Sequence, residues 1–205
     1  ANYSGETSDF CRFNGGKVRQ PGTVSQGRVA LRLLHGKRNS QISITLSSLF
    51  DDDKGKIHHA IQQLRTRNAQ SADDPYLIYS TDVNSTEQVD KANDVDASVM
   101  VGEIVDAAGD SDLVGILASG SLVRGFANSL GQRNWFETSN FNFDFSLYLR
   151  ADKAVKGAYA GRTWESASLK ERLNSARQQL DIMGRDPKDC QPGNYRVYLA
   201  PSAVA

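Results

Sequence analysis

A strict alternation of apolar with mostly polar side chains runs through residues 141–150, which have the sequence FNFDFSLYLR. The apolar positions of this alternation are Phe141, Phe143, Phe145, Leu147 and Leu149. Successive side chains of a strand point to opposite faces of a sheet, so a period of two predicts a long strand with one buried face. Since each buried apolar side chain contributes roughly 1.5–3 kcal/mol, we expect this strand to be a main anchor of the fold.

The segments that follow this strand are predicted to pair with it and to cover it. Residues 154–164 come after a turn at Asp152-Lys153 and should return as an antiparallel neighbour. A helix is predicted over residues 166–183, because apolar side chains recur there at helical spacing and Gly184 is a typical stop signal. Its apolar stripe comprises Leu169, Leu173, Ala176, Leu180 and Met183.

The segments that precede it are predicted as strands over 113–118 and 121–129, with a turn at Gly131-Gln132. Before them, a helix is expected from about Thr86 to Ala108, with Gly109 as its stop. Residues 68–86 are rich in Ser, Asp, Asn and Thr and are expected to form a connection that contains one short strand, Tyr76 to Tyr79.

The amino-terminal part predicts a meander of strands over residues 9–46, with turns at Gly15-Gly16 and Gly36-Lys37. Its strands are expected over 10–14, from Lys17 onward, over 28–35 and over 40–46. Ser47 or Ser48 is expected to cap the next helix, whose acidic first turn suits a positive helix terminus. This helix should lie on the sheet through Ile57, Ala60, Ile61 and Leu64.

Strands followed by a helix thus occur twice, over residues 9–70 and 113–183. The pattern predicts an α+β fold with mixed or antiparallel sheets packed with helices, and an internal duplication of a strands-then-helix unit. We expect residues 1–184 to form an amino-terminal α+β domain. Both ends are expected to be cut, since the chain starts without methionine and stops after an expected strand and one helical turn. So short a helix is not stable alone, so residues 185–205 are expected to begin a connection into a carboxy-terminal domain.

The composition restricts the class of function. The 24 basic and 24 acidic residues give a net charge of +0, which argues against a dedicated nucleic-acid or membrane-surface binder. Apolar runs such as 113–118 are far shorter than the ~20 residues of a membrane helix. The two cysteines, Cys11 and Cys190, lie far apart and outside any metal-like spacing, which favours a reducing compartment and a cytoplasmic protein.

No catalytic, cofactor-binding or metal-binding residues are assigned in this chain. Phosphate-loop, dinucleotide and nucleophile-elbow motifs are absent from the sequence. The histidines are His35, His58 and His59, and adjacent residues of a helix point about 100° apart, which does not suit a shared metal. The carboxylates Asp90, Asp94, Asp96 and Asp106 are weak acid or base candidates, because no partner is known to lie near them.

Basic residues cluster in the first meander, and Arg28 and Arg32 should share its polar face. The cluster comprises Lys17, Arg19, Arg28, Arg32, Lys37 and Arg38. One interpretation is a patch for an anionic ligand. Solvated charges that protect a strand edge from aggregation are the commoner explanation.

Two stretches resemble the TldD/PmbA family, whose members are also described as modulators of DNA gyrase or as peptide-maturation proteins. The first is RFNGGKVRQ at residues 12–20. The second is VRGFANSLG at residues 123–131, followed by Trp135-Phe136-Glu137 and the strand from Phe141. Residues 195–200 also resemble the strand that leads into the family's second domain.

The resemblance implies an α+β amino-terminal domain of a zinc metallopeptidase, or of its non-catalytic partner subunit, in proteolysis or peptide maturation. The family's zinc motif, a His-Glu pair with three further residues before a second His, is absent from this sequence and is expected in the carboxy-terminal domain. The implied partners are a peptide or protein substrate and a second subunit in a homodimer or heterodimer, without membrane. Zinc is implied only for the full-length parent. The alternative is a regulatory module that binds a partner or nucleic acid, as the gyrase name suggests.

Trp135 and Phe136 follow the second stretch and should face opposite sides of a strand. One of them is then expected to be partly exposed, with Arg124, Arg133 and Glu137 as a charged rim typical of an interface anchor. The alternative is that both aromatic side chains pack in the core of this chain.

Overall fold

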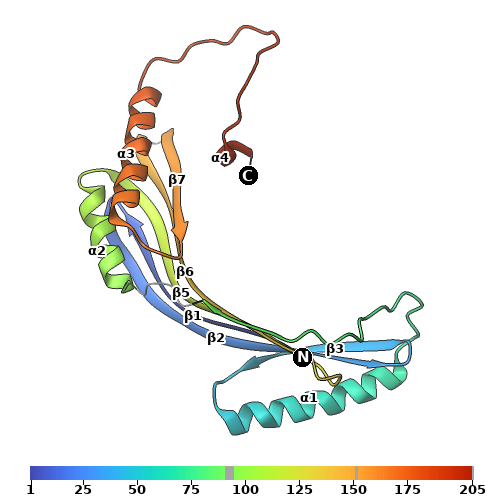
Figure 1. Ribbon diagram of the computed structural model, residues 1–205. Helices are drawn as coiled ribbons and strands as arrows, with labels where there is room; N and C mark the ends of the chain where they lie inside the picture. The colour runs from blue at the N-terminus through green and yellow to red at the C-terminus, as the bar shows by residue number, and fades with distance from the viewer. Residues whose placement is uncertain (91–94, 151, 205) are drawn as a thin grey trace.

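The computed structural model describes residues 1–90, 95–150 and 152–204, and these form strands and helices in the order shown in Figure 1. The strands are β1 (Asn2–Asn14), β2 (Lys17–His35), β3 (Arg38–Leu46), β4 (Thr86–Asp90), β5 (Asp112–Ala127), β6 (Arg133–Arg150) and β7 (Lys153–Gly161). The helices are α1 (Phe50–Gln70), α2 (Ala97–Ala108), α3 (Ser166–Met183) and the single turn α4 (Pro201–Val204). Within these residues, no helix has the length and apolar content that a membrane crossing requires.

All strands join one seven-stranded sheet with the order β3-β2-β1-β5-β6. Both remaining strands pair with β6. β7 pairs with its residues 141–150, and β4 pairs with its residues 134–138. The β4–β6 pair is parallel and the other pairs are antiparallel. The predicted α+β class is confirmed, and both strands-then-helix units are visible, as β1–β3 with α1 and β5–β7 with α3.

The sheet is bent, and α1, α2 and α3 lie on the outer side of the bend, α1 at one end and α2 with α3 at the other (Figure 1). The segment after α3, which ends in α4, curves to the inner side of the bend. The register explains this arrangement. Cys11, Leu117 and Phe143 lie side by side on β1, β5 and β6 and are buried beneath α2 and α3. The residues that alternate with them along each strand point to the other side of the sheet, away from α1, α2 and α3. We call the surface that they form the inner face. It is lined by side chains such as Ser4 and Arg124.

The core lies at the end covered by α2 and α3. Phe143 packs edge-on against Phe13 and stacks on Phe145, and Phe141 packs edge-on against Tyr159 and Trp164. The predicted helix 166–183 has the bounds of α3, and it ends at Gly184 as expected. Four of the five apolar residues expected inside β6 are buried, namely Phe141, Phe143, Phe145 and Leu147.

The fifth, Leu149, is 50% exposed, so its predicted burial is wrong. The register between β6 and β7 shifts between Tyr148 and Arg150. A bulge of this kind breaks the two-residue alternation and turns the following side chain out of the core.

The end covered by α1 is thinly packed. Of the described α1 residues, Ala60, Leu64 and Asn68 are buried, and the Asn68 amide donates to the carbonyl of Leu33 over 2.9 Å. The capping prediction for Ser47 or Ser48 is wrong, since Leu49 is the N-cap and has no side-chain hydrogen bond. Instead the Asp53 carboxylate accepts bonds from the backbone amides of Ser47 and Ser48, at 2.8 and 3.0 Å.

The strands are longer than predicted. β1 begins at Asn2, and each of β2 and β5 is one strand where two were expected. The predicted break near Gly120 is wrong because this glycine is a point of close approach rather than a turn. A Cβ at Gly120 would lie 2.2 Å from the Thr7 carbonyl oxygen on the neighbouring strand.

Three further predictions need correction. The segment Tyr76–Tyr79 forms no strand, and residues 195–200 join no sheet. The helix expected from Thr86 begins only at Ala97, because residues 86–90 form β4 through pairing with β6. Residues 91–94 of that expected helix lie outside the described residues. Its predicted stop at Gly109 is confirmed, with a φ of 53°.

Candidate functional site

The histidines and cysteines do not gather at one place. His58 and His59 are exposed on α1, where a ring nitrogen of His59 lies 3.0 Å from the Gln63 amide nitrogen. Cys11 is buried, which raises the pKa of its thiol, and Cys190 is exposed. In the part of the chain that the structure describes, no three His, Cys, Asp or Glu residues could hold a metal ion together. The described residues therefore do not fit a zinc site.

The carboxylates singled out in the sequence are dispersed as well. Asp96 caps α2 by accepting a 2.8 Å hydrogen bond from the Ser98 amide, which lowers the pKa of its carboxyl. Asp90 lies 3.5 Å from Arg162, and Asp106 is exposed. Asp94 lies outside the described residues. The structure gives Asp96 a structural role and brings none of these groups to a common site.

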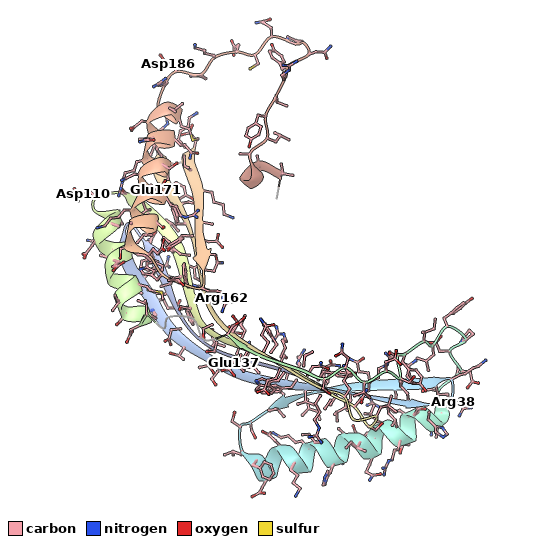
Figure 2. The ribbon with its side chains drawn as sticks, in the orientation of Figure 1. Arg38, Asp110, Glu137, Arg162, Glu171 and Asp186 are labelled. Atoms are coloured by element: carbon pink, nitrogen blue, oxygen red, sulfur yellow. The ribbon has the colours of Figure 1, made fainter. Side chains whose placement is uncertain are left out.

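The basic cluster of the first meander is spread along the sheet. Arg38 lies at the α1 end of the sheet (Figure 2) and forms an ion pair with Asp73 at 2.9 Å. Arg28 instead points to the inner face, where it is aligned with Ser4 on β1 and, through Ser4, with Arg124 on β5. Sequence reasoning missed this neighbour, since only the pairing of β1 with both strands brings the two arginines together.

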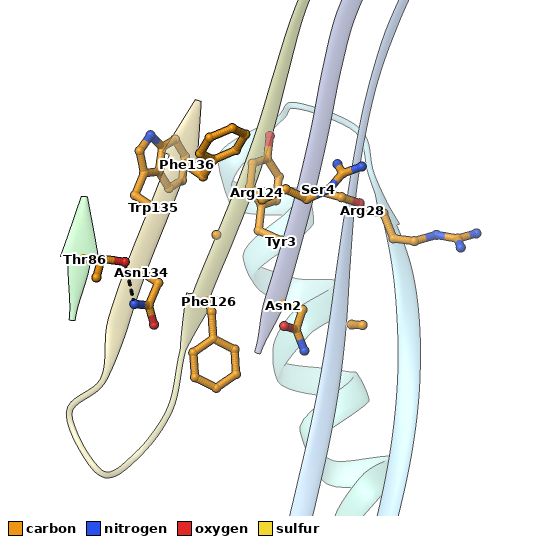
Figure 3. Close-up of a pocket in the computed structure, with 12 residues that line it drawn as sticks. Asn2, Tyr3, Ser4, Arg28, Thr86, Arg124, Phe126, Asn134, Trp135 and Phe136 are labelled. Atoms are coloured by element: carbon orange, nitrogen blue, oxygen red, sulfur yellow. Dashed lines mark hydrogen bonds between the residues drawn. The ribbon is translucent and has the colours of Figure 1, made fainter. Parts of the chain in front are cut away.

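Arg28, Ser4 and Arg124 line a cavity of about 300 Å³ on this part of the sheet (Figure 3). Its wall includes the side chains of Phe126 and Phe136. A second hollow of about 360 Å³ adjoins it along β1 and is also lined by the same two arginines. The inner face therefore combines positive charge, a hydroxyl group and aromatic surface in one place.

The hairpin between β5 and β6 positions Phe126 and Phe136, the aromatic side chains of the cavity wall. The Asn128 side-chain oxygen accepts hydrogen bonds from the amides of Leu130 and Gln132, both at 3.0 Å, and Gly131 takes a φ of 99°. The predicted turn at Gly131-Gln132 is confirmed.

The same hairpin is tied to β4. The Asn134 amide donates to the Thr86 hydroxyl over 2.8 Å, the dashed line in Figure 3. The Gln132 amide donates to the Asn84 carbonyl over 3.0 Å. These polar side chains fix the start of β4, a strand that its own sequence does not predict.

Trp135 and Phe136 face opposite sides of the sheet, as predicted, and both are partly exposed, at 40% and 38%. Trp135 stacks on Tyr3, with ring centroids 6.0 Å apart and ring planes within 8°. The two rings reach each other across Gly125, where a Cβ would lie 3.2 Å from the indole. The glycine of the Arg124-Gly125-Phe126 motif thus makes room for an aromatic pair, and Tyr3 was not predicted as its partner.

These features define an α+β domain built on one long, bent and largely antiparallel sheet, with helices on its outer side and an open inner face. The same fold occurs in TldE from Thermococcus kodakarensis, with a TM-score of 0.72 and 14% identity over 88% of this chain and 43% of that chain. It also occurs in two proteins named as candidate modulators of DNA gyrase. That of Thermotoga maritima has a TM-score of 0.61 and 9% identity, over 85% of this chain and 42% of its own. That of Bacteroides thetaiotaomicron has a TM-score of 0.60 and 11% identity, over 86% and 44%.

The expected resemblance to TldD/PmbA proteins is thereby confirmed at the level of the fold. The chain spans less than half the length of each of these structures. No family model matches the sequence, and no curated protein matches it significantly.

Proposed function

We propose that residues 1–184 are the amino-terminal, non-catalytic domain of a TldD/PmbA-like zinc metallopeptidase or of its partner subunit, acting in proteolysis or peptide maturation. Support comes from the shared fold and from the family-like stretches at residues 12–20 and 123–131. In this proposal the zinc ligands belong to another part of the assembly, because the described residues do not fit a zinc site. Two unpaired thiols, Cys11 and Cys190, favour a reducing, cytoplasmic compartment.

The observation that carries the proposal is the inner face, a long sheet surface that α1, α2 and α3 leave uncovered and toward which the segment ending in α4 curves (Figure 1). Val114, Ile116 and Tyr148 are each partly exposed there, beside polar side chains such as Asn142. An extended peptide can lie along such a surface and contact alternate side chains. The domain would then serve as one wall of a substrate channel.

Exposed apolar side chains elsewhere support assembly with a second subunit or domain. Trp135 is exposed on the outer face next to Tyr3. In the carboxy-terminal segment Tyr195, Val197 and Leu199 are each at least 60% exposed. Aromatic and aliphatic side chains of this kind are typical interface anchors. We infer a homodimer or a heterodimer with a related subunit.

The test places a photo-crosslinking amino acid at Ile116 on the inner face of the full-length protein. The matched control position is Val99, which is similarly exposed but lies on α2. We expect a permanently unfolded polypeptide, such as carboxymethylated α-lactalbumin, to crosslink at Ile116 and not at Val99. Equal crosslinking from both positions would overturn the channel-wall role.

A further inference from the structure

We propose that Arg28, Ser4 and Arg124 form a carboxylate-binding site on the inner face, which holds an acidic side chain or the free carboxy-terminus of an extended peptide. This inference rests on the proposed role of the inner face as a peptide-binding wall, and it adds a chemical preference to that role.

The first argument is the alignment of the three residues. Arg28 is opposite Ser4 on β1, and Ser4 is opposite Arg124 on β5. Neighbouring strands lie about 4.8 Å apart, so the two arginine Cα atoms are separated by roughly 10 Å. Side chains as long as arginine can converge from that distance on one group above Ser4, whose hydroxyl supplies a further donor. All three residues line the cavity, and in Figure 3 the Arg28 side chain extends away from Arg124, so ligand binding requires a change of the Arg28 rotamer that brings its guanidinium over Ser4.

The second argument is that neither guanidinium group forms an ion pair with a described carboxylate, and that the negative charge nearest to them is the Glu6 carboxylate, which Arg124 attracts from a longer distance. The ion pairs among the described residues are Arg38–Asp73, Lys56–Asp53, Arg150–Asp152 and Arg162–Asp90, and neither arginine of the site takes part. Arg124 donates to the Val123 carbonyl over 3.2 Å. A guanidinium has five N–H donors in a planar fork that matches a carboxylate, so most of the donor capacity of this pair is unused.

The third argument limits the charge of the ligand. Glu6 lines the adjoining hollow, and its carboxylate accepts bonds from Ser8 at 2.7 Å and Gln26 at 2.8 Å. These hydrogen bonds, and to a smaller degree the positive charge of Arg124, lower the pKa of Glu6. A fixed negative charge two positions along β1 repels a polyanion such as nucleic acid, yet it leaves room for a single carboxylate between the arginines.

The fourth argument concerns the residue next to that carboxylate. Phe126 and Phe136 line the same cavity and are partly exposed. Since aromatic surface favours apolar contact, the preferred peptide carries an apolar residue beside its acidic group. The ligand is therefore an extended, apolar–acidic stretch of polypeptide.

Three peptides of equal length with a neutral coumarin label test the site by fluorescence anisotropy with the full-length protein. The first has an internal Val-Glu-Val sequence and an amidated end, the second has Val-Gln-Val and a free carboxy-terminus, and the third has Val-Gln-Val and an amidated end. We expect the first or the second to bind at least tenfold more tightly than the third, and the winner identifies the source of the carboxylate.

The decisive variant is R28Q/R124Q. Its matched control is R12Q/R32Q, which also removes two positive charges from the inner face, one on β1 and one on β2, outside the cavity. We expect the first pair to abolish the preference for a carboxylate, while the control changes affinity less than twofold. R28K/R124K should keep part of the preference for a carboxylate, because lysine retains the positive charge. It should not keep all of it, because lysine lacks the planar fork of a guanidinium. Thermal melts of every variant check that it is folded.

Equal losses in both double variants would overturn the site in favour of diffuse electrostatic attraction. Tighter binding of a labelled oligothymidylate than of any peptide, lost in R28Q/R124Q, would overturn it in favour of nucleic acid. Equal binding of all three peptides would refute the carboxylate site and leave the peptide wall standing. No binding of any peptide would refute both.

Discussion

The two ends of the sheet differ in how their helices are packed. The end beneath α2 and α3 holds one continuous core of buried side chains drawn from β1, β5, β6, β7 and both helices. At the other end, α1 buries Ala60, Leu64 and Asn68, and the apolar residues of β2 and β3 that face it are only half-buried. β2 pairs with β1 along residues 17–30 and with β3 along residues 27–35, so backbone pairing continues from one end to the other, whereas the dense side-chain packing does not.

This packing difference indicates which end of the sheet is more stable and which end opens more readily. A dense core resists opening, whereas a region with few buried apolar contacts opens locally at lower free energy. Arg28 is in register with Thr45 of β3, so the proposed site lies next to the thinly packed end. That end can adjust to a peptide or a partner while the α2–α3 end holds the fold.

The largest expected effect comes from the centre of the dense core. Phe143→Ala and Phe145→Ala should each lower the free energy of unfolding by about 3–5 kcal/mol, because both rings are almost completely buried. Asn142→Ala, next to Phe143 but on the opposite, exposed face, should stay within about 0.5 kcal/mol. Urea denaturation midpoints measure both. The reverse order would show that the strand faces are assigned backwards.

The same substitution at the two ends tests the comparison directly. Leu173→Ala in α3 should cost about 3–4 kcal/mol and Leu64→Ala in α1 only about 2 kcal/mol, although both leucines are buried. The half-buried surroundings of Leu64 can collapse into the space, and the close-packed neighbours of Leu173 cannot. Hydrogen exchange should show earlier exchange of α1 amides than of α3 amides. Equal costs and equal protection would refute the packing difference.

Arg177 links the two helices of the dense end. Its guanidinium donates to the carbonyls of Ala107 and Ala108 at the end of α2, at 2.5 and 3.0 Å, and to the Ser111 hydroxyl at 3.1 Å. A positive charge at a helix carboxy-terminus also matches the helix dipole. Arg177→Ala should cost about 1.5–3 kcal/mol in urea denaturation. The neighbouring Gln178→Ala is the control, and similar losses in both would exclude a specific role.

The sequence predicts those elements whose signal is local. The bounds of α3 follow from an unbroken helical stripe and from Gly184, and the turns at Gly15-Gly16 and Gly36 follow from glycines with φ between 57° and 69°. β4 could not be predicted, because residues 86–90 form a strand only through pairing with β6 and hydrogen bonds such as Asn134 to Thr86.

Only part of the candidate site could be predicted from the sequence. The pattern placed Arg28 on a polar face, and the structure confirms its exposed position on β2. Its alignment with Arg124 depends on β1 lying between β2 and β5, a choice of neighbours that no local pattern encodes. The stack of Tyr3 on Trp135 was missed for the same reason, although Gly125 between them is a signal of close approach.

The smallest effect concerns pH and the contact between α2 and the segment before α3. The Glu103 carboxylate accepts hydrogen bonds from Ser166 and from the Trp164 indole, the latter at 2.8 Å, and these bonds lower the pKa of Glu103. A lowered pKa in the folded state means that the ionised carboxylate stabilises the fold above the ordinary glutamate pKa, and that this contribution is lost as the pH falls through the lowered value. Glu103→Gln should therefore destabilise at pH 7, by less than Arg177→Ala, and the gap to the wild type should close below about pH 4.

The exposed Glu171→Gln on α3 is the control, and it should show no such convergence (Figure 2). Trp164→Phe keeps an aromatic ring in the core and removes the donor, so it should flatten the pH dependence while Glu103 is still present. Urea midpoints at pH 7, 5 and 3.5 measure all four proteins. A gap between wild type and Glu103→Gln that is independent of pH would show that Glu103 acts through packing rather than through its charge.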